Sequence, residues 1–313
     1  MSPSRVSLLN ADGMAARVDM PLEKENMKKL WLNLIKIPVI KKKLLGRAFE
    51  FPPIIVVGMH RSGTTLITNL LERCGVFWGR QQSRNNKEAK IFQNLNKKAL
   101  DFLGCSWDQI KFLPIPDQFP EHFNSIEKKM LKELRRHLLP QYWGLHVTRL
   151  LTQPHFGWGW KDPRTSLLLP LWGKIFPNAQ VVHIYRNGHY VALSLLKREM
   201  RLEKDEELLL RWDEIKARYL IYLRLWEDYL NCINRDLPLF KDFYSLRYED
   251  LLQNPEDELF NLLERFNIQP KRSLSEITEI VKIDNIHPPS MPNMDWLYHL
   301  DGCETVLRKM GYC

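Results

Sequence analysis

The sequence lacks the features that define membrane-spanning, secreted and zinc-binding proteins. None of its hydrophobic runs approaches the roughly 20 residues that a membrane-spanning helix needs. Its first twenty residues include Asp12 and Asp19 and hold no continuous apolar block of the kind found in a secretory signal. Its five cysteines form no C-x-x-C pair and no zinc-ligand pattern with histidine. We therefore expect a globular cytoplasmic protein with free thiols and no structural metal.

Positive charge is concentrated near the beginning of the sequence. The 46 Lys and Arg against 37 Asp and Glu give a net charge of +9, yet residues 24–47 hold eight basic residues and a single acid, Glu25. Apolar side chains at helical spacing predict a basic amphipathic helix over residues 23–37, which ends at Pro38. Such a helix either packs on the domain or makes a weak contact with an anionic membrane surface through residues 23–47.

The rest of the chain predicts one α/β domain. We expect residues 1–50 to form an N-terminal extension and residues 51–313 to form the domain, because buried-strand patterns alternate there with helical patterns. The predicted strands are 54–57, 156–160, 180–185 and 243–248, and the predicted helices are 64–75, 87–103, 187–201, 205–231 and 256–266. This order indicates a mostly parallel sheet flanked by helices, in which ligands bind at the carboxyl ends of the strands.

A glycine-containing loop follows the first strand. Residues 58–65 read G-M-H-R-S-G-T-T and lead into a helical run, which is the context of a phosphate-binding loop. The glycines allow the backbone to wrap around an anion, and the amides at the helix start point toward it. Thr64 stands where a nucleoside-triphosphate loop has lysine. The residues predicted to bind the anion are Arg61, Ser62, Gly63, Thr64 and Thr65.

A second anion site is predicted after the third strand. Arg186 stands at the strand end where a magnesium-dependent enzyme of this type needs aspartate, so this position repels a metal and attracts a phosphate. Ser194 and Arg198 lie four residues apart on one face of the following helix. The three side chains together predict a site for a phosphate monoester without magnesium.

The two motifs resemble those of the sulfotransferases. R-S-G-T-T at residues 61–65 is similar to the 5′-phosphosulfate loop of that family, and residues 186–194 are similar to its 3′-phosphate segment. Residues 247–251 and 309–312 resemble its C-terminal elements, so the resemblance covers roughly residues 52–312. It implies a P-loop-type sulfotransferase fold, 3′-phosphoadenosine 5′-phosphosulfate (PAPS) as donor and the bisphosphate (PAP) as product. It also implies metal-independent in-line transfer to a hydroxyl or amine.

The branch of the family is indicated by two positions. The cytosolic small-molecule sulfotransferases usually carry lysine at the position of Arg61 and tryptophan at the position of Leu66. The sequence R-S-G-T-T is closer to the bacterial and tyrosylprotein-like branch.

Candidate catalytic cations follow the second strand. The segment W-K-D-P-R-T at residues 160–165 is similar to the Lys-Asp-Pro segment of the tyrosylprotein branch. That resemblance implies that Lys161, beside Arg61, steadies the migrating sulfuryl group, whereas the alternative is a solvated lysine. Asp162 is predicted to cap the turn that begins at Pro163. Arg164 is predicted to be a cation that contacts substrate or supports its neighbours.

Glu88 is the predicted general base. It lies on the extension of an apolar stripe near the start of the helix predicted at 87–103, and such a carboxylate is suited to accept a proton. The resemblance adds that the bacterial branch has a glutamate eight residues before an asparagine, here Asn96. The alternative is an acid that only stabilises the helix start. The other candidate bases are His60, His146 and His155.

Aromatic residues leave two interpretations open. Tyr248 contacts the nucleotide or is a buried core residue, and Trp143, Trp158 and Trp160 line an acceptor pocket or belong to the core.

Two rival functions also remain at this level. One is a magnesium-dependent P-loop kinase of small molecules. The other is a non-catalytic nucleotide-binding or polyanion-binding protein. For the sulfotransferase, the expected acceptor is a small molecule, a glycan or a lipid, and no nucleic-acid partner is expected.

Overall fold

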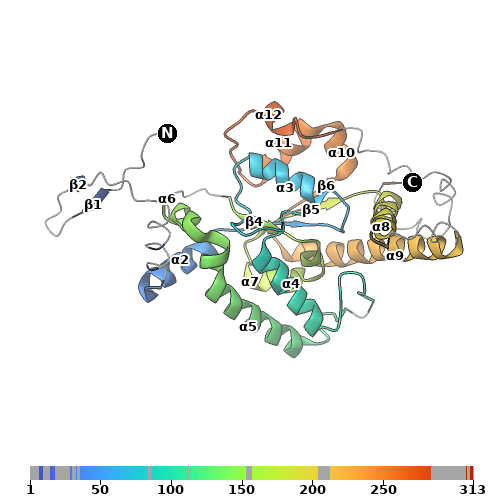
Figure 1. The fold of residues 1–313 in the computed structure, drawn as a ribbon, viewed down its shortest axis with the longest axis horizontal. Coiled ribbons are helices and arrows are strands. Elements are labelled where there is room, and N and C mark those ends of the chain that lie inside the picture. The colour runs from blue at the N-terminus through green and yellow to red at the C-terminus, as the bar shows by residue number, and fades with distance from the viewer. Residues whose placement is uncertain are drawn as a thin grey trace.

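The computed structural model describes residues 7–9, 15–17, 29, 33, 36–83, 86–111, 113–152, 157–203, 212–282, 308 and 311–312. Within them the chain forms a four-stranded parallel sheet with the strand order β4-β3-β5-β6 (Figure 1). The strands are β3 (Ile54–Val57), β4 (Gly159–Lys161), β5 (Gln180–Tyr185) and β6 (Asp242–Arg247). The predicted parallel α/β architecture is therefore confirmed.

Helices cover both faces of the sheet because strand β3 is apolar on both sides. Ile54 and Val56 pack into one hydrophobic cluster, and Ile55 and Val57 pack into the other. Figure 1 shows the first layer above the sheet, and it consists of α3 (Thr64–Arg73), α10 (Tyr248–Gln253), α11 (Pro255–Arg265) and α12 (Leu274–Thr278). The second layer consists of α4 (Lys90–Phe102), α5 (Pro120–His137), α7 (Leu169–Ile175), α8 (Gly188–Glu203) and α9 (Trp212–Asp236).

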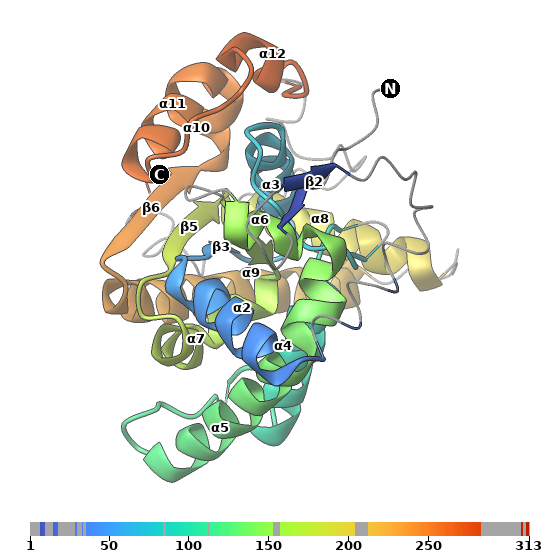
Figure 2. The ribbon, with the colours of Figure 1, turned by 90° about the vertical axis from the view of Figure 1, so that its left-hand side faces the viewer.

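A helix that the sequence patterns did not predict begins at Pro38. Pro38 lies at the start of α2 (Pro38–Glu50), where its missing N–H group costs no helical hydrogen bond. Helix α2 buries Leu44 and Ala48 in the main core and lies against α6 (Arg149–Thr152), as Figure 2 shows. Most of the helix predicted at residues 23–37 lies outside the described residues.

Earlier in the chain, a short antiparallel pair is described, β1 (Ser7–Leu9) with β2 (Ala15–Arg17). The division at residue 50 remains a prediction.

The remaining element boundaries follow the sequence patterns with local shifts. The strands predicted at 54–57 and 180–185 match β3 and β5. Tyr248 begins α10 instead of ending a strand. The sequence patterns did not predict α5, although it buries Phe123, Ile126, Met130 and Leu134 at helical spacing.

Gly159 permits the close approach of strands β3 and β4. It pairs with Ile54, and a Cβ atom added to it would lie 1.9 Å from the Ile54 carbonyl oxygen. We expect Gly159→Ala to lower the free energy of unfolding by about 2 kcal/mol or more, because the backbone must separate there. Urea unfolding followed by tryptophan fluorescence measures this.

The matched control is Gly46→Ala on α2, where an added Cβ meets nothing within 4 Å. It should raise stability by up to about 1 kcal/mol, because alanine is the better helix former. Equal stability changes for the two variants would contradict the importance of the close approach.

Candidate active site

The glycine loop connects β3 to α3 at the carboxyl edge of the sheet. Gly58 has φ +148° and Gly63 has φ +93°, conformations that L side chains rarely adopt. Space is also limited, since a Cβ on Gly63 would lie 2.2 Å from the Tyr248 ring. The Gly58 N–H donates to Ser166 Oγ at 3.0 Å, which fixes the start of the loop. The loop is thus held in one shape by residues that follow β4 and β6.

The loop has the properties of an oxyanion cradle. Gly63 is the N-cap of α3 and has no side chain with which to cap it. The amides of Thr64 and Thr65 at the start of the helix are therefore available to a ligand, whereas the Leu66 N–H donates to the Gly63 carbonyl. Ser62 Oγ is buried and has no hydrogen-bond partner among the described residues. A buried hydroxyl of this kind is satisfied when an anion binds. The residues present therefore fit a phosphate or phosphosulfate group.

The two predicted anion motifs meet directly. Arg61 Nε donates to Ser194 Oγ at 2.7 Å, although 133 residues separate them in the sequence. Arg186 is almost buried, and its guanidinium lies 4.6 Å from the centre of the Tyr248 ring and 5.7 Å from that of Tyr190. The buried Tyr248 ring also packs against Gly63 of the loop. Tyr248 therefore contacts both motifs.

Arg198, the last predicted residue of the second motif, lies on the same helix as Ser194 and is exposed. The positive charge of Arg198 is one of the causes that lower the pKa of His60 in the loop. The structure therefore brings the predicted nucleotide residues to one edge of the sheet.

Lys161 joins the loop to Glu88. It pairs in register with Val56 at the end of β4 and is only 2% exposed. Its Nζ lies 3.4 Å from Thr65 Oγ1 and 3.5 Å from Glu88 Oε1. Burial lowers the pKa of Lys161, and the neighbouring carboxylates oppose that shift. The alternative of a solvated lysine is wrong.

Glu88 is buried, but it does not lie on the predicted helix. Helix α4 begins at Lys90, and Glu88 precedes its N-cap residue, Ala89. The backbone carbonyl of Glu88 accepts from the Ser83 N–H, and the Glu88 N–H donates to Ser83 Oγ. The backbone groups of Glu88 therefore make no helical hydrogen bonds. The prediction that this helix begins at residue 87 is therefore wrong.

The Glu88 carboxylate is held by three donors. Besides Lys161, Arg164 Nη2 lies 3.5 Å from Oε2, and Gln93 Nε2 donates to the same oxygen at 2.6 Å. The sequence analysis missed Gln93. Its position five residues after Glu88, within the first turn of α4, is the signal that could have indicated it.

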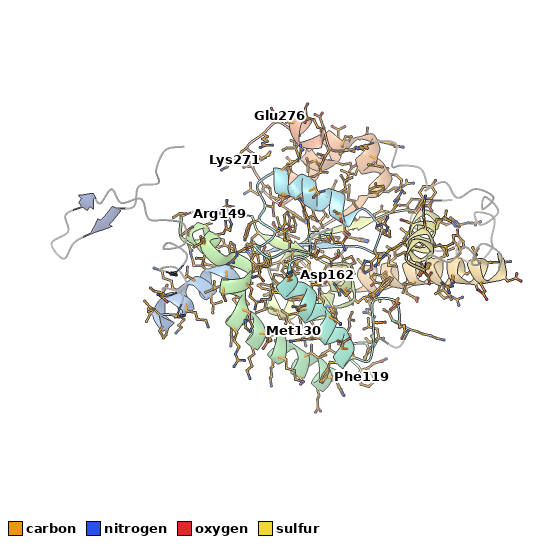
Figure 3. The ribbon with its side chains drawn as sticks, in the orientation of Figure 1. Phe119, Met130, Arg149, Asp162, Lys271 and Glu276 are labelled. Carbon is orange, nitrogen blue, oxygen red and sulfur yellow. The ribbon has the colours of Figure 1, made fainter. Side chains whose placement is uncertain are left out.

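Asp162 organises the groups behind this cluster, and Figure 3 shows it near the centre of the molecule. It caps the turn at Pro163 by accepting from the Arg164 N–H at 3.1 Å, as predicted, and it also accepts from Arg164 Nε at 2.9 Å. Asn96 Nδ2 donates to its other oxygen at 2.9 Å. Burial raises the pKa of Asp162, and Arg164 opposes this. Arg164 therefore bridges Asp162 and Glu88.

The candidate histidine bases lie in different surroundings. His60 is in the loop, its ring packs edge-on to Trp107 at 4.7 Å, and its pKa is lowered to about 3 by burial and by four neighbouring cations. His146 packs at 4.7 Å from Phe77, which pairs with the residue before β4, at the opposite edge of the sheet. His155 lies outside the described residues.

The tryptophans belong to the core. Trp143, Trp158 and Trp160 are each 0% exposed, and Trp160 stacks on Phe92 with ring centroids 4.0 Å apart. Their alternative role as the lining of an acceptor pocket is wrong, because they fill the space between β4 and its helical layer.

The described part of the chain holds neither a metal-binding cluster nor a helix suited to span a membrane. No group of three or more His, Cys, Asp or Glu side chains is arranged to hold a metal ion. No helix among those residues is long and apolar enough to cross a membrane.

Comparison with known proteins shows the family. The sequence profile described as the sulfotransferase family matches residues 52–271, which include the glycine loop, Lys161, Arg186 and Tyr248. The chain belongs to the sulfotransferase family. The second motif, the cluster around Glu88 and the loop all lie inside the matched region of the chain.

Comparison with single sequences gives a distant relative. An uncharacterised protein of Aquifex aeolicus (strain VF5) is 26% identical over 235 residues, and the match covers 72% of this chain and 27% of the relative. The chain thus corresponds to little more than a quarter of that relative's length.

Solved structures of sulfotransferases are also similar. A sulfotransferase domain from the curacin biosynthetic pathway is 18% identical with a TM-score of 0.44, and the match covers 84% of this chain and 92% of that one. A sulfotransferase from Mycobacterium tuberculosis is 14% identical with a TM-score of 0.49, and the match covers 92% and 82% of the two chains.

Proposed function

We propose that this sulfotransferase transfers a sulfuryl group from PAPS to an acceptor hydroxyl or amine, without a metal. The observation that carries the proposal is the hydrogen bond from Arg61 to Ser194, which joins two anion sites of the kind that a nucleotide with 5′ and 3′ charges requires. The cluster of Lys161 and Glu88 begins at Thr65, at the end of the same loop. The residues proposed to bind the donor therefore lie next to those proposed to transfer the proton.

The nucleotide residues divide by the charge that they bind. The loop residues bind the 5′-phosphosulfate through backbone amides, hydroxyls and the Arg61 guanidinium, namely Arg61, Ser62, Gly63, Thr64 and Thr65. Arg186, Ser194 and Arg198 bind the 3′-phosphate, and Tyr248 supports both groups. When bound, the donor supplies an activated sulfuryl group attached to the nucleotide 5′-phosphate.

The chemical step uses Glu88, Lys161 and Arg61. Glu88 takes the proton of the acceptor as the acceptor atom forms its bond to sulfur. The bond from sulfur to the phosphate oxygen breaks, and Lys161 and Arg61 stabilise the negative charge that remains on that oxygen. Arg164 and Gln93 keep the Glu88 carboxylate in place. Burial of Lys161 and Glu88 keeps these charges away from bulk water, which strengthens their interactions.

The proposal extends to the branch of the family, the acceptor and the N-terminal region. The sequence of the loop supports membership of the bacterial and tyrosylprotein-like branch, and the acceptor class is a small molecule, a glycan or a lipid. The exposed lysines of α2 support a weak membrane-surface contact within residues 23–47. We also infer a cytoplasmic protein with an extension at residues 1–50 and a catalytic domain at residues 51–313.

Binding of the product nucleotide tests the function. In calorimetric titrations we expect PAP to bind at micromolar or tighter concentration, about −8 kcal/mol or better, with chelator present. ATP with magnesium should bind far more weakly, because the loop lacks the phosphate-binding lysine. Magnesium-dependent ATP binding without PAP binding would indicate a kinase. The absence of binding by both nucleotides would contradict the enzyme assignment and favour a polyanion-binding protein.

A further inference from the structure

Tyr312 is anchored beside the strand that leads to Arg186. Its hydroxyl donates to Glu249 Oε2 at 2.9 Å. The Arg247 guanidinium lies 4.4 Å from the centre of its ring, and the Tyr185 ring meets it edge-on at 6.4 Å. Burial raises the pKa of the Tyr312 hydroxyl, so this group remains protonated and donates its hydrogen.

Glu249 extends this contact to the second anion site. The residue is 8% exposed, and its Oε1 accepts from the backbone N–H of Asn187 at 3.0 Å. Asn187 directly follows Arg186, and its Oδ1 accepts from the backbone N–H of His189 at 2.9 Å, which caps the start of α8. One buried carboxylate therefore connects Tyr312 to the backbone beside Arg186.

We propose that Tyr312 is a positioning residue for the second anion site and thereby sets the affinity for a nucleotide 3′-phosphate. This inference rests on the proposed function, in which Arg186 binds that phosphate. A buried carboxylate with a donor on each oxygen has one preferred orientation. Without the tyrosine hydroxyl, Oε2 of Glu249 faces Arg247 Nε, which is 3.6 Å away. The carboxylate then turns toward that cation and its bond to the Asn187 N–H weakens.

The test compares two nucleotides that differ only in the 3′-phosphate. Calorimetric titrations of the full chain with PAP and with 5′-AMP are made for the wild type and for Tyr312→Phe, which keeps the ring and removes the donor. We expect the Kd for PAP to rise about fivefold, since a hydrogen bond to a charged group is lost. The Kd for 5′-AMP should stay within about twofold, because the loop is untouched.

Tyr244→Phe is the matched control. Tyr244 lies on β6, and its hydroxyl donates to Glu258 Oε2 at 3.1 Å, so the variant removes a similar bond away from Asn187. It should leave both affinities unchanged. Hydrogen exchange of a peptide that contains Asn187 should become faster in Tyr312→Phe and not in the control.

The other outcomes separate the two proposals. A wild-type protein that binds PAP and 5′-AMP equally would overturn the 3′-phosphate site and this inference with it. A wild type that prefers PAP, with a Tyr312→Phe variant that keeps that preference, would overturn the role of Tyr312 alone. The same holds if the variant loses affinity for both nucleotides equally, because the residue would then support the fold in general.

Discussion

Glu88→Gln should lower kcat on the order of a hundredfold or more, because the amide cannot take the proton of the acceptor. The substitution keeps the size of the side chain and an oxygen for the Gln93 amide, so the site should retain its shape. The affinity for PAP should stay within about twofold, since the base acts on the acceptor rather than on the nucleotide. PAP release from PAPS is measured with the acceptor that reacts fastest in a panel of phenols, alcohols, sugars and amines.

Glu72→Gln is the matched control for this substitution. Glu72 lies on α3, is 42% exposed and forms a surface ion pair with Lys87, so the same chemical change is made outside the cluster. It should leave kcat unchanged, because exposed ion pairs contribute little. Near-normal turnover of Glu88→Gln would place the base elsewhere, and His60 would then be the first residue to test.

Arg186→Ala should weaken PAP binding on the order of a hundredfold, because charge-assisted hydrogen bonds to the 3′-phosphate are lost. The affinity for 5′-AMP should change little, since that nucleotide lacks the phosphate concerned. Arg186→Lys should give an intermediate affinity, because it keeps the charge and loses the two-pronged geometry. Calorimetric titration of each variant measures both constants.

The control for the arginine substitution lies on α9. Arg224 is exposed on that helix, two residues from Trp226, whose Nε1 donates to the Arg186 carbonyl at 3.0 Å. Arg224→Ala should bind PAP like the wild type. Unchanged PAP affinity in Arg186→Ala, with a normal melting temperature, would show that the second phosphate binds elsewhere.

Sequence patterns determine much of the site because its motifs are local. Positive φ at Gly58 and Gly63 is a property of the loop itself, and the helix after it follows from its own apolar spacing. The cap at Asp162 is equally local, since the acceptor and the turn that begins at Pro163 are adjacent in the chain. Such features need only a few neighbouring residues, so the sequence indicates them directly.

The wrong start predicted for α4 arises because its local signal permits two structures. Polar residues before an apolar stripe suit a helix start, but Glu88 bonds to Ser83 and stays outside α4. The two bonds between Glu88 and Ser83 decided where this helix begins.

By itself, the sequence determined the strand, loop and helix of the anion site, the parallel α/β class, and the candidate residues of both motifs. Only the tertiary structure decided which of those residues touch. The bonds from Arg61 to Ser194, from Lys161 to Glu88 and from Tyr312 to Glu249 join segments that are far apart in the chain. They depend on the strand order β4-β3-β5-β6, which places the ends of β3, β4 and β5 side by side. No local pattern contains that order, because it is set by the packing of the helices on both faces of the sheet.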